Sequence, residues 1–477
     1  MIQNLPNFLS WAQGKSIAVV GAGISNRPLI ELLLQAGLEV TVFDRSTEEL
    51  LAPWKESLLA RNLRANWSLG PAYLDRLHGF DLIFRTPIVR PDLAALEAER
   101  KRGAIISSEM EVFLQLCPCE VIGITGSDGK TTTSTLTALA LETAGYRTWL
   151  GGNIGAPLLS SLPEMRASDK VVVELSSFQL MSMATSPHTA VITNLSPNHL
   201  DVHKDFQEYA EAKAQIFSHQ APTDRLVLLG SDPVLQDFAL RARGQVIWTE
   251  VRPFGDQVVF GLDHDLLYYQ ASPQAEQEKL LERQAISLPG RFNALNVLSA
   301  LAATDHLLNS KQKLQVREAL ASFKGVDHRL QEIRVLEGVR YYDSSIDSSP
   351  ARTIASLSAF RERGIPLYLI AGGKDKNLQY EELGRAILAS CRQVYLCGQN
   401  ADLIAQAVEA AQKAQAGFND QLKVQILPSY AACLAAARQE AKAGSAVLLS
   451  PAGTSFDRFK NFEERGQLFQ KLVAELR

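Results

Sequence analysis

Short apolar runs recur along the chain, and segments with helical patterns separate them. Such runs occupy residues 16–20, 40–43, 121–125, 171–174, 190–193, 367–370, 394–397 and 446–450. They are continuous rather than alternating, which is typical of parallel strands buried on both faces of a sheet. Ala-rich helical stretches such as residues 401–416 lie between the later runs. The pattern therefore predicts an α/β protein with three regions of mostly parallel sheet. Residues 251–286 are polar and irregular, and we interpret them as an insertion of hairpins and loops without an assigned role.

The composition is that of an ordinary globular protein. The 477 residues suggest two to four domains. A formal net charge of −4 argues against a nucleic-acid surface, which needs a concentrated excess of Lys and Arg. No apolar run reaches about eighteen residues, the N-terminus lacks a signal-peptide layout, and the five cysteines are sparse. We therefore expect a cytoplasmic protein with reduced thiols that neither binds nucleic acid nor inserts into a membrane, and we expect a monomer.

The strongest local motif is Thr-Gly-Ser-Asp-Gly-Lys-Thr at residues 125–131, between an apolar strand and a helical run. Glycines allow backbone N–H groups to turn toward phosphate oxygens, Lys130 adds a positive charge, and Thr131 can offer a hydroxyl to Mg²⁺. The strict pattern G-x-x-x-x-G-K-[ST] requires glycine where this chain has Ile124, so the match is partial. The motif predicts a cradle for a nucleoside triphosphate.

A carboxylate and an imidazole follow two later strands. Glu174 ends one apolar run, and His199 comes shortly after another. Both positions belong to the carboxyl edge at which open α/β sheets bind ligands, so these groups could lie near a Mg²⁺ ion held by Thr131. In isolation, a Glu or His is more often a surface or capping residue. His199 and His203 are four residues apart, but Leu200 stands where a zinc peptidase has Glu, so no zinc site is expected.

The first glycine turn suggests a dinucleotide. Gly-Ala-Gly-Ile-Ser-Asn at residues 21–26, with Asp44 further along, is similar to the Rossmann fingerprint. Asn26 replaces the third glycine, which weakens the match. An NAD-dependent dehydrogenase is one interpretation, although it leaves Lys130 without a role.

Several motifs in order resemble the Mur ligase family. These are the loop in the form T-G-x-x-G-K-T, Glu-Leu-Ser-Ser-Phe-Gln at 174–179, Asn-His-Leu-Asp at 198–201 and Glu-Ala-Lys at 211–213. The resemblance extends over almost the whole chain and implies three domains. They are a UDP-binding Rossmann-like domain at 1–110, a central ATP-binding P-loop domain at 111–325 and an amino-acid-binding Rossmann-like domain at 326–477.

The resemblance also implies an ATP site with two Mg²⁺ ions. The metal ligands it implies are Thr131, Glu174, His199 and a carbamylated Lys213. Composition alone would make Lys213 a solvated helix lysine. The ATP contacts it implies are Gly126, Ser127, Asp128, Gly129, Lys130, Thr131, Thr132, Asn153, Asn293, Asn296, Arg329 and Asp343. The groups expected to take part in catalysis are Lys130, Glu174, His199, Lys213 and Arg329.

For the first domain, the resemblance implies a UDP-bearing substrate on the glycine turn. The residues it implies there are Ile24, Ser25, Asp44, Arg45, Thr86, Asn153 and Ser176. Arg-Thr-Pro-Ile at residues 85–88 resembles an Arg-Ser-Pro-Gly segment that borders the UDP, with Ile88 in place of glycine.

The last third resembles the branch of the family that adds D-glutamate. The resemblance rests on Gly-Gly-Lys-Asp-Lys at 372–376 and on the run from Ser450 to Gly466. It implies an amino-acid pocket formed by Lys376, Ser348, Ser455 and Phe462. Asp343 lies one residue before the family's Asp position, and Asp347 is a second carboxylate nearby, so either could serve the nucleotide.

The activity implied by this resemblance is ATP-dependent amide formation in peptidoglycan precursor synthesis. The carboxylate of UDP-N-acetylmuramoyl-L-alanine would become an acyl phosphate, which the amine of D-glutamate then attacks. A folylpolyglutamate synthase shares the loop and the mechanism, but residues 460–466 and the UDP-type first domain favour the Mur branch. A non-catalytic nucleotide switch would have no need of Lys213 or Lys376.

Overall fold

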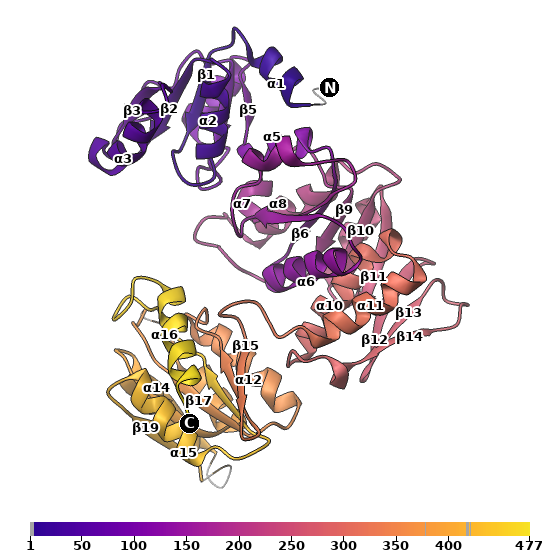
Figure 1. Ribbon diagram of the computed structural model, residues 1–477, viewed down its shortest axis with the longest axis vertical. Helices are drawn as coiled ribbons and strands as arrows, with labels where there is room; N and C mark the ends of the chain where they lie inside the picture. Colours follow the sequence, from indigo (N-terminus) through magenta and orange to yellow (C-terminus); the bar gives the residue numbers. More distant parts are fainter. Residues whose placement is uncertain (1–3, 377, 416–418, 420) are drawn as a thin grey trace. The chain divides into compact units, whose positions relative to one another are not determined.

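Three separate sheets organise the chain (Figure 1). The computed structural model describes residues 4–376, 378–415, 419 and 421–477. The chain divides into two compact units. One comprises the chain up to Leu280 together with Leu295–Leu320, and the other comprises Leu281–Ala294 with the chain from Ala321 onward.

The first sheet has five parallel strands in the order β3-β2-β1-β4-β5. Its strands are β1 Ile17–Val20, β2 Val40–Asp44, β3 Asn66–Leu69, β4 Leu82–Arg85 and β5 Ile105–Ser107. Its helices are α1 Leu5–Ala12, α2 Arg27–Gln35, α3 Glu48–Leu59 and α4 Ala94–Lys101, and α5 Glu109–Leu116 follows. All four residues of β1 are buried, as the continuous apolar run predicts.

The second sheet has nine strands in the order β14-β13-β12-β11-β10-β9-β6-β8-β7. Its strands are β6 Glu120–Thr125, β7 Thr148–Gly152, β8 Lys170–Glu174, β9 Thr189–Ile192, β10 Arg225–Leu229, β11 Gln245–Glu250, β12 Val258–Asp263, β13 Leu266–Gln270 and β14 Glu278–Glu282. The pairings from β7 through to β12 are parallel, and β12 pairs with β13 in antiparallel fashion. Residues 251–286 thus contain the predicted hairpin, which extends the central sheet.

The helices between β6 and β15 along the chain are α6 Lys130–Thr143, η1 Leu159–Glu164, α7 Ser177–Leu180, α8 Phe206–Ser218, α9 Pro233–Arg241, η2 Arg283–Ala285, α10 Arg291–Thr304, η3 Asp305–Leu307 and α11 Ser310–Ser322. Helix α6 begins directly after the phosphate-loop motif and buries Leu136, Ala140 and Leu141. The loop is therefore held between a buried strand and a buried helix.

The third sheet has six strands in the order β15-β16-β20-β17-β18-β19. Its strands are β15 Gln331–Leu336, β16 Val339–Asp343, β17 Leu367–Ala371, β18 Cys391–Leu396, β19 Lys423–Ile426 and β20 Ala446–Leu449. Its helices are α12 Pro350–Glu362, α13 Glu381–Ser390, α14 Ala401–Ala414, α15 Tyr430–Glu440 and α16 Phe462–Ala474. Only the β15–β16 pairing is antiparallel among those described.

The predicted fold class is confirmed, because each of the three sheets is mostly parallel and is combined with helices. Among the described residues, no helix is both long and apolar enough to cross a membrane.

Candidate functional site

At two positions of the phosphate loop, residues 126–129, the backbone has a conformation that only glycine adopts easily. Gly126 has a φ of +144° and Gly129 a φ of +79°. A Cβ atom at Gly126 would lie 1.9 Å from Thr193 Oγ1, and one at Gly129 would lie 2.5 Å from Asn296 Oδ1. Both glycines are therefore required by the close approach of neighbouring segments.

The segment that follows β9 holds this loop in shape. The Asp128 amide donates to Asn194 Oδ1 at 3.0 Å, and Thr193 Oγ1 donates to the Asp128 carbonyl at 2.6 Å. The Ser127 amide donates to the Asn194 carbonyl at 2.9 Å, and the Ser127 hydroxyl lies 3.0 Å from the Tyr209 hydroxyl. These contacts hold the loop against the segment after β9 and against α8.

Lys130 is the first residue of α6, and its ammonium group lies over the loop. Nζ donates to the carbonyls of Gly126 and Ser127, both at 2.8 Å. The N-terminus of α6 adds its own positive potential at the same place. Thr131 is half-buried and Thr132 is buried. The arrangement suits a polyphosphate.

Glu174 ends β8 and is 2 % exposed. One of its carboxylate oxygens, Oε1, accepts a hydrogen bond from Asn153 Nδ2 at 2.9 Å. The other, Oε2, has no hydrogen-bond partner among the residues that the structure describes. A buried, unpaired carboxylate oxygen is costly, and a divalent cation would satisfy it.

Lys213, on α8, is also 2 % exposed. Its Nζ donates to Thr125 Oγ1 at 3.2 Å and lies 4.8 Å from the ring centre of Tyr209. Burial, reinforced by the charge of Lys130, lowers the pKa of Lys213 well below its usual value, although Glu174 opposes the shift. The amine is therefore biased toward its neutral, nucleophilic form.

His199 lies on the exposed loop after β9 and has a φ of +54°. Its ring centre is 5.2 Å from that of Phe178. His203 stacks on the same phenyl ring, and its Nε2 lies 2.9 Å from Ser177 Oγ. Burial is the main reason why the pKa of His203 lies below its ordinary value. Nothing in the sequence selects Tyr209, because only the fold brings its hydroxyl to Ser127 of the phosphate loop. His203, whose spacing from His199 raises only the question of a zinc site, packs against Tyr209.

The two asparagines of α10 have different surroundings. Asn293 is 3 % exposed and its Nδ2 donates to the Pro289 carbonyl at 2.6 Å. Asn296 accepts a hydrogen bond from Thr133 Oγ1 at 3.2 Å, so it lies against the first turn of α6. The structure thus brings Asn296 beside the phosphate loop.

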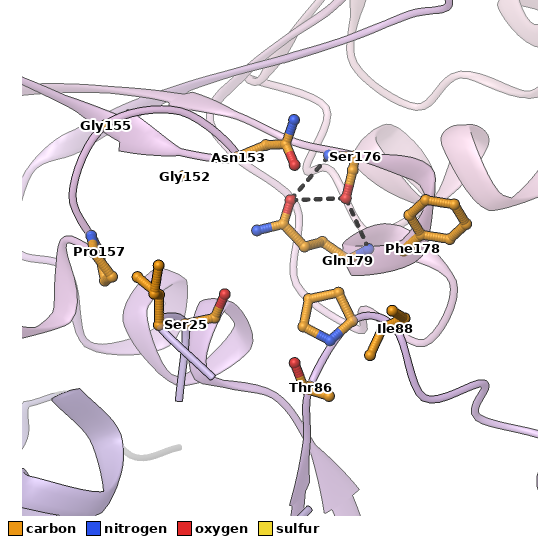
Figure 2. Close-up of a pocket in the computed structure, with 12 residues that line it drawn as sticks. Ser25, Thr86, Ile88, Gly152, Asn153, Gly155, Pro157, Ser176, Phe178 and Gln179 are labelled. Atoms are coloured by element: carbon orange, nitrogen blue, oxygen red, sulfur yellow. Dashed lines mark hydrogen bonds between the residues drawn. The ribbon is translucent and has the colours of Figure 1, made fainter. Parts of the chain in front are cut away.

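A cavity of about 380 Å³ lies within the first unit (Figure 2). Residues from the first sheet's loops and residues after β7 and β8 line it: Ile24, Ser25, Thr86, Pro87, Ile88, Gly152, Asn153, Gly155, Pro157, Ser176, Phe178 and Gln179. Figure 2 shows Ser25, Thr86 and Ile88 on the side opposite Asn153 and Ser176. Five of the seven predicted UDP-binding residues therefore share one cavity.

The other two, Asp44 and Arg45, do not line this cavity. Arg45 is exposed, whereas the Asp44 carboxylate accepts from the amides of Ala22 at 2.6 Å and Ser46 at 2.7 Å. Partial burial would raise the pKa of Asp44, but the two backbone bonds, together with the Ser46 hydroxyl and the charge of Arg45, hold the pKa below its ordinary value. Asn26, at the third-glycine position, donates to the Val20 and Gly21 carbonyls and so closes the turn.

In the second unit, Asp343 is fully buried at the end of β16. Its Oδ2 lies 2.7 Å from Nδ1 of His328, and its Oδ1 accepts from the Ser345 amide at 2.8 Å. The hydrogen bond with Asp343 raises the pKa of His328. Asp347 accepts from the hydroxyls of Ser356 and Ser450 at 2.7 and 2.8 Å. Both carboxylates are therefore engaged within the unit.

Two segments predicted to bind the amino acid lie side by side. The Lys374 amide donates to the Thr454 carbonyl at 2.8 Å, and the Thr454 amide donates back at 3.0 Å. This bridge places the segment of Lys376, which is exposed, beside that of Ser455, which is buried.

The remaining predicted residues of this unit are half-buried. Ser348 lies in the loop between β16 and α12, and Arg329 follows His328. Phe462 begins α16, and its ring centre is 6.2 Å from that of His328. His328 therefore connects the segment of Arg329 with the start of α16.

Comparisons with known proteins find relatives of this chain over its whole length. The family model of the Mur ligase middle domain matches residues 124–304, and that of the Mur ligase glutamate ligase domain matches residues 328–453. The chain is 43% identical over 478 residues to the UDP-N-acetylmuramoylalanine–D-glutamate ligase of Ruminiclostridium cellulolyticum. It is 41% identical over 476 residues to that of Acetivibrio thermocellus. Each comparison covers 100% of both chains.

Solved structures share the fold at lower identity. The UDP-N-acetylmuramate–alanine ligase MurC from Thermotoga maritima matches with a TM-score of 0.55 and 18% identity, covering 96% of this chain and 99% of that one. The MurF ligase from the same organism, in complex with ADP, matches with a TM-score of 0.55 and 17% identity, covering 96% and 94%. The chain belongs to the Mur ligase family, and within it to the group of UDP-N-acetylmuramoylalanine–D-glutamate ligases.

Proposed function

We propose that the protein is an ATP-dependent amide ligase that adds D-glutamate to UDP-N-acetylmuramoyl-L-alanine in peptidoglycan precursor synthesis. Relatives that match it over their full length carry the corresponding name. One structural observation supports the proposal most directly. Lys213, a buried lysine of lowered pKa, bonds to Thr125 at the start of the phosphate-loop motif, and β8, which pairs with β6, ends in Glu174, one of whose oxygens has no partner among the described residues.

The reaction would proceed in two displacements. A carboxylate oxygen of the UDP substrate attacks the γ-phosphorus of ATP, and ADP leaves. The amine nitrogen of D-glutamate then attacks the acyl carbon, phosphate leaves and the nitrogen loses a proton. Positioning and charge neutralisation supply most of the catalysis in phosphoryl transfer, and Lys130 and Arg329 are the cations proposed for that purpose.

We assign two Mg²⁺ ions to Thr131, Glu174, His199 and a carbamylated Lys213. The unpaired oxygen of Glu174 supports this assignment, because it fits a hard cation that prefers oxygen ligands. When bound, such ions would offset the charge of the phosphate oxygens. A neutral Lys213 amine can add to CO₂, releasing a proton and leaving an anionic carbamate.

The nucleotide would contact residues 126–132 and the asparagines Asn153, Asn293 and Asn296. The approach of Asn296 to Gly129 supports its place in this set. Asp343 would serve the nucleotide indirectly. Its hydrogen bond with His328 holds the segment that carries Arg329. Asp347 would have a structural role, because two hydroxyls already donate to its carboxylate.

The UDP-bearing substrate would occupy the cavity lined by Ile24, Ser25, Thr86, Asn153 and Ser176, with Asp44 and Arg45 nearby on the first turn. D-glutamate would contact Lys376, Ser348, Ser455 and Phe462. A lysine and hydroxyl groups suit its side-chain carboxylate, which needs a cation and hydrogen-bond donors. On the first turn, Asn26 stands where the dinucleotide fingerprint has its third glycine, and its side chain donates to the Gly21 carbonyl.

Domain boundaries near residues 110 and 325, a monomeric state and a cytoplasmic location complete the proposal. The first boundary falls within α5, the helix that separates the first and second sheets along the chain. The second lies between α11 and β15.

Phosphate release tests the function. The purified protein is incubated with ATP, Mg²⁺, UDP-N-acetylmuramoyl-L-alanine and, in separate reactions, D-Glu, L-Glu, L-Lys or diaminopimelate. We expect release only with D-Glu, together with a product whose mass equals the two substrates less one water. A folded sample that releases no phosphate with any of the four amino acids would remove the proposal. Release with L-Lys or diaminopimelate instead would assign the chain to another branch of the family.

A further inference from the structure

Arg85 is a fully buried arginine at the end of β4, beside the cavity but not in its lining. Its guanidinium donates to the carbonyls of Thr86 at 3.4 Å, Pro87 at 3.3 Å and Val89 at 3.0 Å. These atoms belong to the loop that forms one side of the cavity. The same guanidinium therefore fixes the backbone of that side.

The opposite side of the cavity is held by the remaining donors. Arg85 Nη2 donates to the Phe178 carbonyl at 3.1 Å and to Ser182 Oγ at 2.8 Å, and Nε donates to Ser182 Oγ at 3.1 Å. Phe178 lies in α7 and lines the cavity. Arg85 thus bonds directly to the backbone of three lining residues drawn from both sides.

The chemistry of these contacts requires arginine. The acceptors surround a planar group whose five N–H donors point in fixed directions, which a lysine ammonium cannot reproduce. Burial lowers the pKa of Arg85 to about 10, so the side chain still carries its charge at neutral pH. A buried charge that bonds to carbonyls and a hydroxyl orders those groups without contacting a ligand.

We infer that Arg85 is a positioning residue for the UDP-bearing substrate, and that it sets the separation between the Thr86–Ile88 loop and α7 by bonding to both. The inference rests on the proposed function, which places that substrate in this cavity. It predicts that Arg85 governs affinity for one of the three substrates only.

The test uses steady-state kinetics of the full-length enzyme with Arg85→Lys and Arg85→Gln. Both variants should raise KM for UDP-N-acetylmuramoyl-L-alanine roughly tenfold, because several charge-assisted hydrogen bonds are lost. KM for ATP and for D-glutamate should stay within about twofold, since Arg85 bonds to no residue that is assigned to either of them. Arg61→Gln is the matched control: it removes an arginine from the same unit, where Arg61 forms a surface pair with Glu31. It should change none of the three constants.

Ser182→Ala is a milder variant that decides the question if the Arg85 variants fail to fold. It removes one acceptor of two Arg85 bonds, and KM for the UDP substrate should rise about threefold. Wild-type KM in Arg85→Lys would show that only the charge matters and would overturn the inference. An equal rise of KM for all three substrates, or no change in Ser182→Ala, would overturn it as well. Failure of the proposed function is distinguished by the wild-type protein itself, which would then release no phosphate with the UDP substrate.

Discussion

At the scale of single residues, Lys213 shows how burial can prepare a side chain for modification. Its nitrogen lies among Thr125, Tyr209 and the charge of Lys130, in surroundings that oppose protonation. Carbamylation would convert this buried amine, for which the charged form is unfavourable, into an anion that a metal ion can neutralise.

Labelled carbon dioxide can report this modification. With ¹³C-bicarbonate, the wild-type protein should show a carbamate resonance in its ¹³C spectrum, and Lys213→Met should lack it. Lys204→Met is the control, because Lys204 is exposed, and it should retain the signal. Because the neutral amine is the reacting form, occupancy should decline as pH falls through the lowered pKa of Lys213. An identical signal in Lys213→Met would refute carbamylation there.

At the scale of elements, the phosphate loop between β6 and α6 depends on its close contact with the segment after β9. Gly126→Ala should destabilise the protein by about 3 kcal/mol, since it combines a strained φ with a collision at Thr193. Gly145→Ala isolates the first effect, because Gly145 has a φ of +91° and open space around it, and it should cost about 1 kcal/mol. Urea unfolding measures both, and equal losses would argue against the collision.

The elements were more predictable from sequence than their long-range contacts. The apolar runs of β6 and β8 and the glycines of the loop between β6 and α6 are local signals, so the strands, the loop and the fold class could be predicted. The inward direction of Arg85, the stacking of His203 on Phe178 and the pairing of Asp343 with His328 depend on distant chain segments. A local sequence pattern carries no information on such pairings. The sequence alone therefore could not decide whether Asp343 or Asp347 serves the nucleotide.

At the scale of the whole molecule, stability should depend on pH through His328. Its pKa is raised chiefly by the bond to Asp343, with Asp327 and Glu463 adding to the effect. A raised folded-state pKa means that the stabilisation is complete below the unfolded value of about 6.5 and is lost as pH rises through the folded value. Urea midpoints between pH 6 and 9 should therefore fall for the wild type.

Two variants check the source of this dependence. Asp343→Asn should lower the midpoint most at pH 6 and flatten the curve, because the charged pair is removed. Asp347→Asn should lower it by a similar amount at every pH in this range, since its partners are hydroxyls. Parallel curves for wild type and Asp343→Asn would contradict the assignment to this pair.

The segment after β9 performs two tasks at once. Thr193 and Asn194 form hydrogen bonds with Asp128 of the phosphate loop, and His199 lies five residues further along the same segment. A shift of this stretch would therefore disturb nucleotide and imidazole together, and neither could drift independently. An insertion between Thr193 and His199 would then change the phosphate loop and the position of the imidazole at the same time, so we expect this segment to tolerate insertions poorly.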